Sequence, residues 1–208
     1  MTVTAALIAF GLAAGLLTIT PGLDTALVLR TAAVDGARRA ALAAAGICLG
    51  TVVWGAAVAF GLGALLAASS LAFEVLKWAG AAYLVGLGVK LIARPRERFD
   101  VGAASGPELS GAAWLRRGLL TNLLNPKVGV FYVSFLPQFL PAGVPAAPFL
   151  FMLACLHALM GVVWFALLIG ATRPIAGALR KTSVVRWLDR LTGGVFLGFG
   201  VRLAFERR

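Results

Sequence analysis

Two charged residues, Asp24 and Lys127, lie inside stretches of the sequence that are otherwise apolar. A charged side chain in a hydrocarbon layer costs about 2.5–3.5 kcal/mol on insertion scales, so such residues are usually functional. One acid and one base of this kind predict a site for a small zwitterion. Asp24 would bind an ammonium group or carry a coupling proton, and Lys127 would bind a carboxylate. Alternatively, the two residues form a structural salt bridge with each other that holds the two halves of the chain together. The two interpretations overlap, because a transporter can break such a pair when substrate arrives.

A proline precedes each of these charges, in the segments TPGLD (20–24) and NPK (125–127). Proline removes a backbone donor and disfavours α geometry in the residue before it, so each helix should divide into two halves. Free N–H groups at the start of a half-helix favour an anion, and free carbonyls at the end of one favour a cation. The predicted binding or coupling residues are Thr20, Pro21, Gly22, Asp24, Asn122, Asn125, Pro126 and Lys127.

Some of these polar residues have a simpler interpretation. Thr18, Thr20 and Asn122 flank the two breaks and could cap freed backbone groups instead of contacting substrate. Asn125 belongs more closely to the proline motif, which favours a direct role. His157 is the single histidine of the chain. It could relay protons, but a neutral, hydrogen-bonded interior histidine is the favoured interpretation.

The elements that hold these residues are predicted to be membrane helices. Of the 208 residues, 61% are hydrophobic and 13% are charged, whereas a soluble domain carries about 25% charged residues. The mean hydropathy is +0.94. The net charge of +11 does not indicate a nucleic-acid partner, because the basic residues form short runs between long apolar stretches. The lipid bilayer is therefore the expected environment.

The apolar stretches predict an all-α integral membrane protein with six transmembrane helices. Helices 1 and 4 are the ones interrupted at proline. The sixth helix is short in apolar residues, so Arg190 and Arg202 would have to reach the membrane surface. The predicted spans are near residues 4–29, 41–66, 73–92, 113–139, 147–171 and 189–206.

Basic residues predict the orientation of the helices. They lie in the loops after spans 1, 3 and 5, and the loops after spans 2 and 4 have none. The positive-inside rule places loops 1, 3 and 5 in the cytoplasm and both termini outside. The C-terminal Arg207 and Arg208 disagree with this orientation but are outnumbered. The basic loop residues are Arg30, Arg38, Arg39, Arg94, Arg96, Arg98, Arg116, Arg117, Arg173, Arg180, Lys181, Arg186 and Arg190.

The chain reads as one transmembrane domain, 1–208, built from two related halves. Repeat 1 covers about 1–93, a polar cytoplasmic linker covers 94–110, and repeat 2 covers about 111–208. Each half has three spans, so the two copies must have opposite orientations, as in many secondary transporters. The alignment of KWAGAAYLVGLGVKLI (77–92) with DRLTGGVFLGFGVRLA (189–204) supports the repeat. Glycine pairs such as Gly46-x3-Gly50 and Gly194-x3-Gly198 fit close helix packing in lipid.

The sequence resembles the LysE/RhtB family of amino-acid exporters over nearly its whole length. The proline motifs lie in two of the stretches that carry the resemblance. One departure is Leu23, which stands where the family's first motif has a second proline, so the geometry of that break could differ. The stretches are TPGLDTALVLRTAAVDGARRAALAAAGICLG (20–50), LAFEVLKWAGAAYLVGLGVKLI (71–92) and RRGLLTNLLNPKVGVFYVSFLPQFL (116–140).

This resemblance implies efflux of amino acids or small derivatives across the bacterial inner membrane, coupled to protons as an antiport. It implies a single domain of six helices, a possible homo-oligomer and no cofactor. It does not fix the amino acid, since relatives handle basic, hydroxylated and branched ones. Rocking of one repeat against the other would give alternating access to a site between the two breaks.

Three other classes of function compete with export of amino acids. A metal or other metabolite exporter of the same fold is the first alternative, although one histidine, two separated cysteines and one embedded acid make a poor metal site. A membrane thiol–disulfide electron carrier using Cys48 and Cys155 is a remote one, because neither cysteine is beside a proline. An enzyme is not expected, since hydrolase and nucleotide-binding motifs are missing from the sequence.

Overall fold

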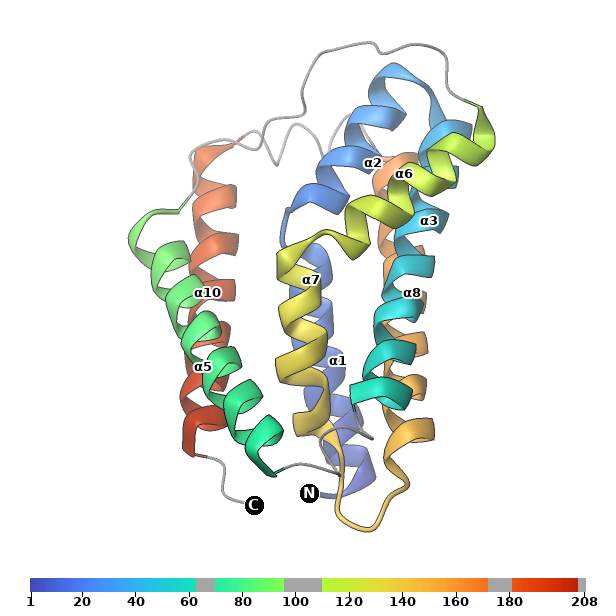
Figure 1. Cartoon of the computed structure of the whole chain (residues 1–208). Helices are drawn as coiled ribbons and strands as arrows, with labels where there is room; N and C mark the ends of the chain where they lie inside the picture. Colours follow the sequence, from blue (N-terminus) through green and yellow to red (C-terminus); the bar gives the residue numbers. More distant parts are fainter. Residues whose placement is uncertain (63–69, 96–109, 172–180, 206–208) are drawn as a thin grey trace.

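A computed structural model describes residues 1–62, 70–95, 110–171 and 181–205 (Figure 1). All the elements in these ranges are helical, which confirms the predicted all-α class. The elements are α1 (Val3–Ile19), α2 (Leu23–Val34), α3 (Ala37–Ala56), the π-helix η1 (Ala57–Leu62), α5 (Ser70–Ala93), α6 (Gly111–Leu123), α7 (Pro126–Val130), the π-helix η2 (Phe131–Phe135), the 3₁₀-helix η3 (Leu136–Phe139), α8 (Ala146–Gly170) and α10 (Thr182–Phe205).

Within the described residues, two helices are long and apolar enough to cross a membrane, Ala37–Gly61 and Ala146–Gly170. The pair α1 and α2 makes a third such element only if both helices count as one span, which bends by 50° at the break. The remaining spans, and the count of six, stay predictions. The first two spans have shifted bounds, because α2 continues to Val34 and α3 begins at Ala37. Gly36 makes that short turn possible with φ of 93°.

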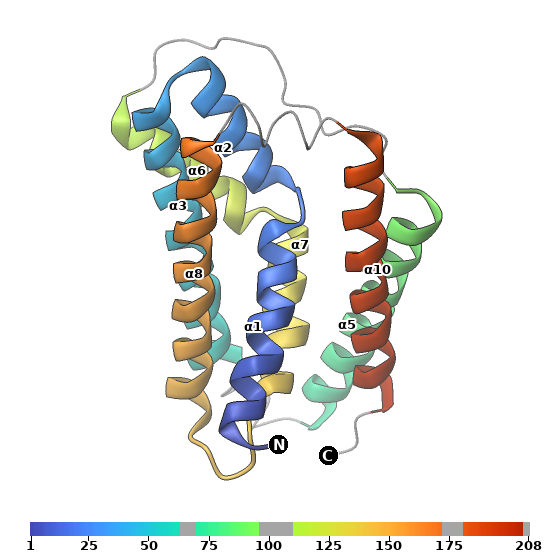
Figure 2. The ribbon, with the colours of Figure 1, turned by 180° about the vertical axis from the view of Figure 1, so that it is seen from behind.

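The helices lie roughly side by side (Figures 1 and 2). One group contains α1, the α7–η3 segment, α3 and α8, and its core is made of aromatic and small residues such as Phe10, Phe131 and Ala154. The other group is the pair α5 and α10, which pack along each other at one side in both views. α1 begins and α10 ends at the same end of the molecule, and the α2–α3 turn lies at the opposite end.

Glycines set how closely the helices approach. A methyl group at Gly46 of α3 would overlap the backbone of Leu115 in α6, and one at Gly118 of α6 would overlap the carbonyl of Ala43. α5 and α10 cross in a similar way at Gly88 and Gly193, where an added Cβ would lie 2.7 Å from the other glycine's carbonyl oxygen. Backbone-to-backbone packing of this kind is typical of helices in lipid.

Replacing Gly118 by alanine is expected to destabilise the protein by about 1–3 kcal/mol, because the added methyl group meets backbone that cannot rotate away. The measurement is the midpoint of thermal unfolding of the detergent-purified protein. Gly194→Ala is the control, since a Cβ at Gly194 has no heavy atom within 4 Å among the described residues. Equal midpoints for the two variants would contradict the proposed close crossing of α3 and α6.

Candidate functional site

The first helix break lies between Ile19 and Leu23. Thr20 ends α1, and both its backbone N–H and its hydroxyl donate to the carbonyl of Leu16, at 3.0 and 2.6 Å. The Thr20 hydroxyl therefore bonds back to a carbonyl of its own helical turn, and its role at a substrate stays a prediction. Pro21 and Gly22 follow outside any helix, and Gly22 is the extended residue that precedes α2.

The second break lies between α6, which ends at Leu123, and α7, which begins at Pro126. Asn125 caps α7, because its Oδ1 accepts a hydrogen bond from the Lys127 backbone N–H at 3.1 Å. Asparagine is among the best N-cap residues, and proline at the first helical position needs no backbone donor. The sequence Asn-Pro therefore ends one helical segment and starts the next, which places Lys127 in the first turn of α7.

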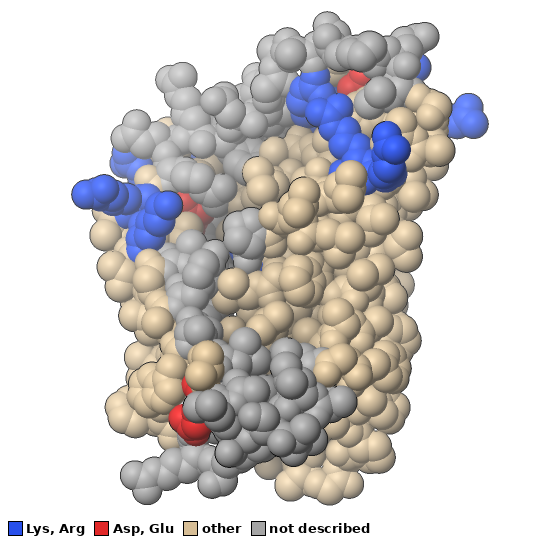
Figure 3. Space-filling model, in the orientation of Figure 1, with Lys and Arg blue, Asp and Glu red and all other residues tan. Residues whose placement is uncertain are grey.

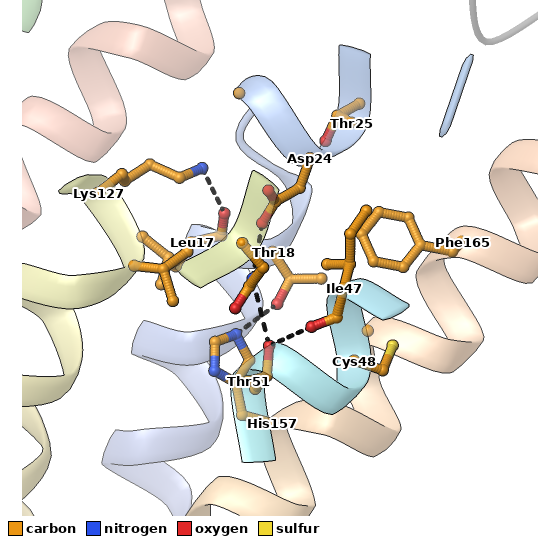
Figure 4. Close-up of a pocket in the computed structure, with 14 residues that line it drawn as sticks. Leu17, Thr18, Asp24, Thr25, Ile47, Cys48, Thr51, Lys127, His157 and Phe165 are labelled. Atoms are coloured by element: carbon orange, nitrogen blue, oxygen red, sulfur yellow. Dashed lines mark hydrogen bonds between the residues drawn. The ribbon is translucent and has the colours of Figure 1, made fainter. Parts of the chain in front are cut away.

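The two breaks meet through the side chain of Lys127. Its Nζ donates to the carbonyl oxygens of Leu17 and Thr20, at 3.2 and 3.0 Å (Figure 4). These carbonyls belong to the last turn of α1, where the helix no longer supplies donors. Gly22 makes room for the lysine, since an added Cβ there would lie only 3.1 Å from Nζ. Lys127 thus connects the start of α7 to the end of α1.

Asp24 lies in the first turn of α2 and faces the same region. Its Oδ2 accepts a hydrogen bond from Asn122 Nδ2 at 2.9 Å. Thr51 of α3 lies behind this pair, with its hydroxyl 3.5 Å from the same Asn122 nitrogen. Asn122 is almost fully buried, and Gly50 of α3 lets it approach so closely that a Cβ at Gly50 would lie 2.6 Å from Asn122 Oδ1.

Several polar atoms around Asp24 still have no partner among the described residues. Asp24 Oδ1, Asn122 Oδ1 and Asn125 Nδ2 are buried and make no hydrogen bond. Buried polar atoms are nearly always satisfied in native proteins, by protein, water or ligand. The acceptors Asp24 Oδ1 and Asn122 Oδ1 are therefore the atoms that a molecule entering here can contact.

A cavity of about 40 Å³ joins Asp24 and Lys127. At about 10–15 Å³ of such volume for each water molecule, this space holds a few waters and is too small for an amino acid. Figure 4 shows side chains from α1, α2, α3, α7 and α8 around it. The lining residues are Leu17, Thr18, Gly22, Asp24, Thr25, Ile47, Cys48, Thr51, Asn122, Lys127, Val128, His157, Gly161 and Phe165.

The structure brings the predicted site residues together. Four of the eight, Gly22, Asp24, Asn122 and Lys127, line the cavity, and the others belong to the two breaks. Their roles in binding stay predictions, as does a direct salt bridge between Asp24 and Lys127. Sequence reasoning missed Thr51, although its place directly after Gly50 in the small-residue motif was a signal that another helix comes close.

The described residues hold no group of three or more His, Cys, Asp or Glu side chains that could bind a metal ion. The two cysteines differ in their surroundings, because Cys48 is buried at the cavity and Cys155 is exposed on α8. A thiol–disulfide carrier needs both thiols. We therefore expect Cys155→Ala to keep export within about twofold of the wild type, since changes at exposed sites are usually small. Loss of efflux from cells in this variant would contradict the expectation that export does not need the Cys155 thiol.

This arrangement, an all-helical chain with membrane-length helices around a cavity that holds one acid and one base, is typical of a membrane transporter. The sequence profile of the LysE type translocators matches residues 16–207. The chain belongs to the LysE translocator family. No solved structure matches it.

Several curated relatives cover almost the whole chain. One is an uncharacterized membrane protein of Vibrio cholerae serotype O1, which is 34% identical over 95% of each chain. A homoserine/homoserine lactone efflux protein of Salmonella typhi is 32% identical over 96% of each chain. A leucine efflux protein of Klebsiella pneumoniae is 30% identical over 89% of this chain and 88% of the relative.

Proposed function

We propose that this protein exports amino acids or close derivatives from the cytoplasm, by alternating access coupled to protons. The observation that carries the proposal is that an acid and a base from two separate helix breaks line one cavity. An amino acid presents one ammonium group and one carboxylate at a fixed short separation. The names of the two efflux relatives, for homoserine or its lactone and for leucine, support the same substrate class.

The proposed binding mode gives each charged residue one task. The substrate ammonium group binds Asp24, where Oδ1 has no partner. The substrate carboxylate binds Lys127 and draws its Nζ away from the carbonyls of Leu17 and Thr20. Asn122 keeps Asp24 oriented through the hydrogen bond to Oδ2. Charge-assisted hydrogen bonds of this kind are about twice as strong as neutral ones, so a small polar molecule can be held firmly.

Lys127 also links binding to movement. When it turns to the substrate, the last carbonyls of α1 lose a donor, and the joint between α1 and α2 becomes free to change its angle. The cavity must widen in any case, because about 40 Å³ is too small for an amino acid. Motion of the first broken helix against the second, as the inverted-repeat plan predicts, would open the site to one side at a time.

We further propose that the protein lies in the bacterial inner membrane, as a possible homo-oligomer, with both termini outside. Figure 3 supports this orientation, because the Lys and Arg side chains gather in the half of the molecule that contains the α2–α3 turn. The positive-inside rule assigns that half to the cytoplasm.

The test of the proposed function is an efflux assay. Cells that lack their own amino-acid exporters are loaded with mixed dipeptides, and each amino acid is followed inside and outside by mass spectrometry. We expect one or a few amino acids to leave faster when this chain is present in the membrane than with an empty vector. Unchanged efflux of every amino acid, with the protein present in the membrane, would contradict the proposal.

A further inference from the structure

His157 is the centre of a hydrogen-bonded chain that joins three elements beside the cavity. Its Nδ1 lies 3.0 Å from the hydroxyl of Tyr132 in η2, and its Nε2 lies 3.2 Å from the hydroxyl of Thr18 in α1. The ring itself is buried and contacts the rings of Phe10 and Phe131. His157 and Thr18 also line the cavity (Figure 4), so this chain reaches the proposed substrate site.

The direction of the hydrogen bonds can be derived from Thr18. A hydroxyl has one proton to donate, and Thr18 donates it to the carbonyl of Ala14 at 2.7 Å. Towards His157 the Thr18 oxygen can therefore only accept, so Nε2 of His157 carries a proton. Nδ1 is then the acceptor for the Tyr132 hydroxyl. In this conformation the imidazole is neutral, and both of its nitrogen atoms are satisfied.

A second proton can be added only at Nδ1. It requires Tyr132 to turn its O–H away and accept from the ring instead, so protonation changes a contact between α8 and η2. The added charge would be placed in a cavity that already contains Lys127. Four elements contribute charged or titratable groups that line the cavity or contact the imidazole. These groups are Asp24 of α2, Cys48 of α3, Lys127 of α7 and Tyr132 of η2. From α1, the polar group that contacts the imidazole is the hydroxyl of Thr18.

Asp24 is the only carboxylate among the lining residues. A protonated His157 would add a positive charge to a cavity that already contains Lys127, and a substrate ammonium group at Asp24 would add another while the substrate carboxylate occupies Lys127. The two added positive charges repel each other, so each disfavours the other. The proton and the substrate therefore weaken each other's binding. Opposed binding of this kind is the condition under which a proton moving one way drives an amino acid the other way.

We propose that His157 is the site where the coupling proton binds, and that its protonation and the binding of the substrate ammonium group oppose each other. This inference rests on the proposed export function and names the residue that couples it to protons. In the outward-facing state Nδ1 takes a proton from outside, and in the inward-facing state a substrate ammonium group displaces that proton into the cytoplasm. Each cycle then exchanges one proton for one substrate.

The test uses the purified full chain in phospholipid vesicles, with radiolabelled leucine and homoserine as probes. Exchange is measured with equal pH and equal amino acid on both sides. Accumulation is measured with an acidic vesicle interior, from which outgoing protons drive the amino acid inwards. The variant is His157→Gln, whose amide can still donate to Thr18 but cannot take up a proton. Leu159→Ala, an exposed position on the same helix, is the control.

We expect the wild type to perform both reactions. His157→Gln should keep exchange within about threefold but lose accumulation, whereas a merely structural histidine would keep both in this variant. Accumulation by His157→Gln at the wild-type level would overturn the inference. If the wild type performs neither exchange nor accumulation, the result contradicts the proposed export function. If the wild type exchanges amino acid but does not accumulate it, the result contradicts coupling to protons.

A second variant keeps the inference testable if His157→Gln loses both reactions. Tyr132→Phe leaves the imidazole in place but removes its partner at Nδ1. The midpoint of accumulation against external pH should then move by about 0.4–1 pH unit, since the lost hydrogen bond acts on the position that is protonated. An unchanged midpoint for Tyr132→Phe would overturn the inference.

Discussion

Replacing Asp24 by asparagine is expected to reduce export at least about 100-fold, since a hydrogen bond to a charged group is worth about 1.5–3 kcal/mol and the attraction to an ammonium group adds to it. The new side chain has the same shape, and its oxygen can still accept the hydrogen bond from Asn122. What is lost is the negative charge at the buried Oδ1. The measurement is the initial efflux rate of the amino acid that the wild type exports.

The matched control is Asp35→Asn, the same chemical change at the residue that ends α2 outside the cavity lining. We expect it to export within about twofold of the wild type. Both variants should reach the membrane, because neither change adds a charge to an apolar segment. Wild-type efflux by Asp24→Asn would remove Asp24 from the proposed mechanism.

Replacing Lys127 by methionine is expected to abolish export and also to lower stability. Methionine has a similar length but cannot donate to the carbonyls of Leu17 and Thr20. Each buried carbonyl left without a donor costs about 1–3 kcal/mol, and the substrate carboxylate loses its positive partner. Efflux and the midpoint of thermal unfolding of the purified protein should therefore fall together.

Lys90→Met is the control for this change, because Lys90 is an exposed lysine at the end of α5. It should leave both efflux and the unfolding midpoint near the wild-type values. Lys127→Arg is expected to fail as well, since a guanidinium group is larger and the existing ammonium group already lies close to Gly22. Normal efflux by Lys127→Met would contradict a carboxylate-binding role.

Much of the candidate site was predictable because proline and charge act locally. A proline within an apolar stretch disfavours a continuous helix in any context. Among the described elements, α1 ends at Ile19 and α2 begins at Leu23, on either side of Pro21, and α7 begins at Pro126. The helix bounds explain why the break does not need the second proline of the family motif, where this chain has Leu23. Leu23 is the first residue of α2 and is exposed, and proline at that position is tolerated rather than required.

The parts that were not predictable depend on which helices pack together. The pair Gly46 and Gly50 lies at a close crossing, as its spacing suggested, but the equivalent pair Gly194 and Gly198 has no heavy atom nearby among the described residues. Neighbouring Gly193 makes the contact instead, which a spacing rule cannot distinguish. Thr51 reaches the site for the same reason, since only the α3–α6 crossing places it behind Asn122.

The central claim is that Asp24 and Lys127 together bind one amino acid. Its most direct test is equilibrium binding of the amino acid that the efflux assay identifies, measured by isothermal titration calorimetry on the detergent-purified wild type, Asp24→Asn and Lys127→Met. We predict binding to the wild type and affinity at least about tenfold weaker in each variant, which corresponds to about 1.4 kcal/mol. Affinity equal to the wild type in both folded variants would show that the substrate binds elsewhere.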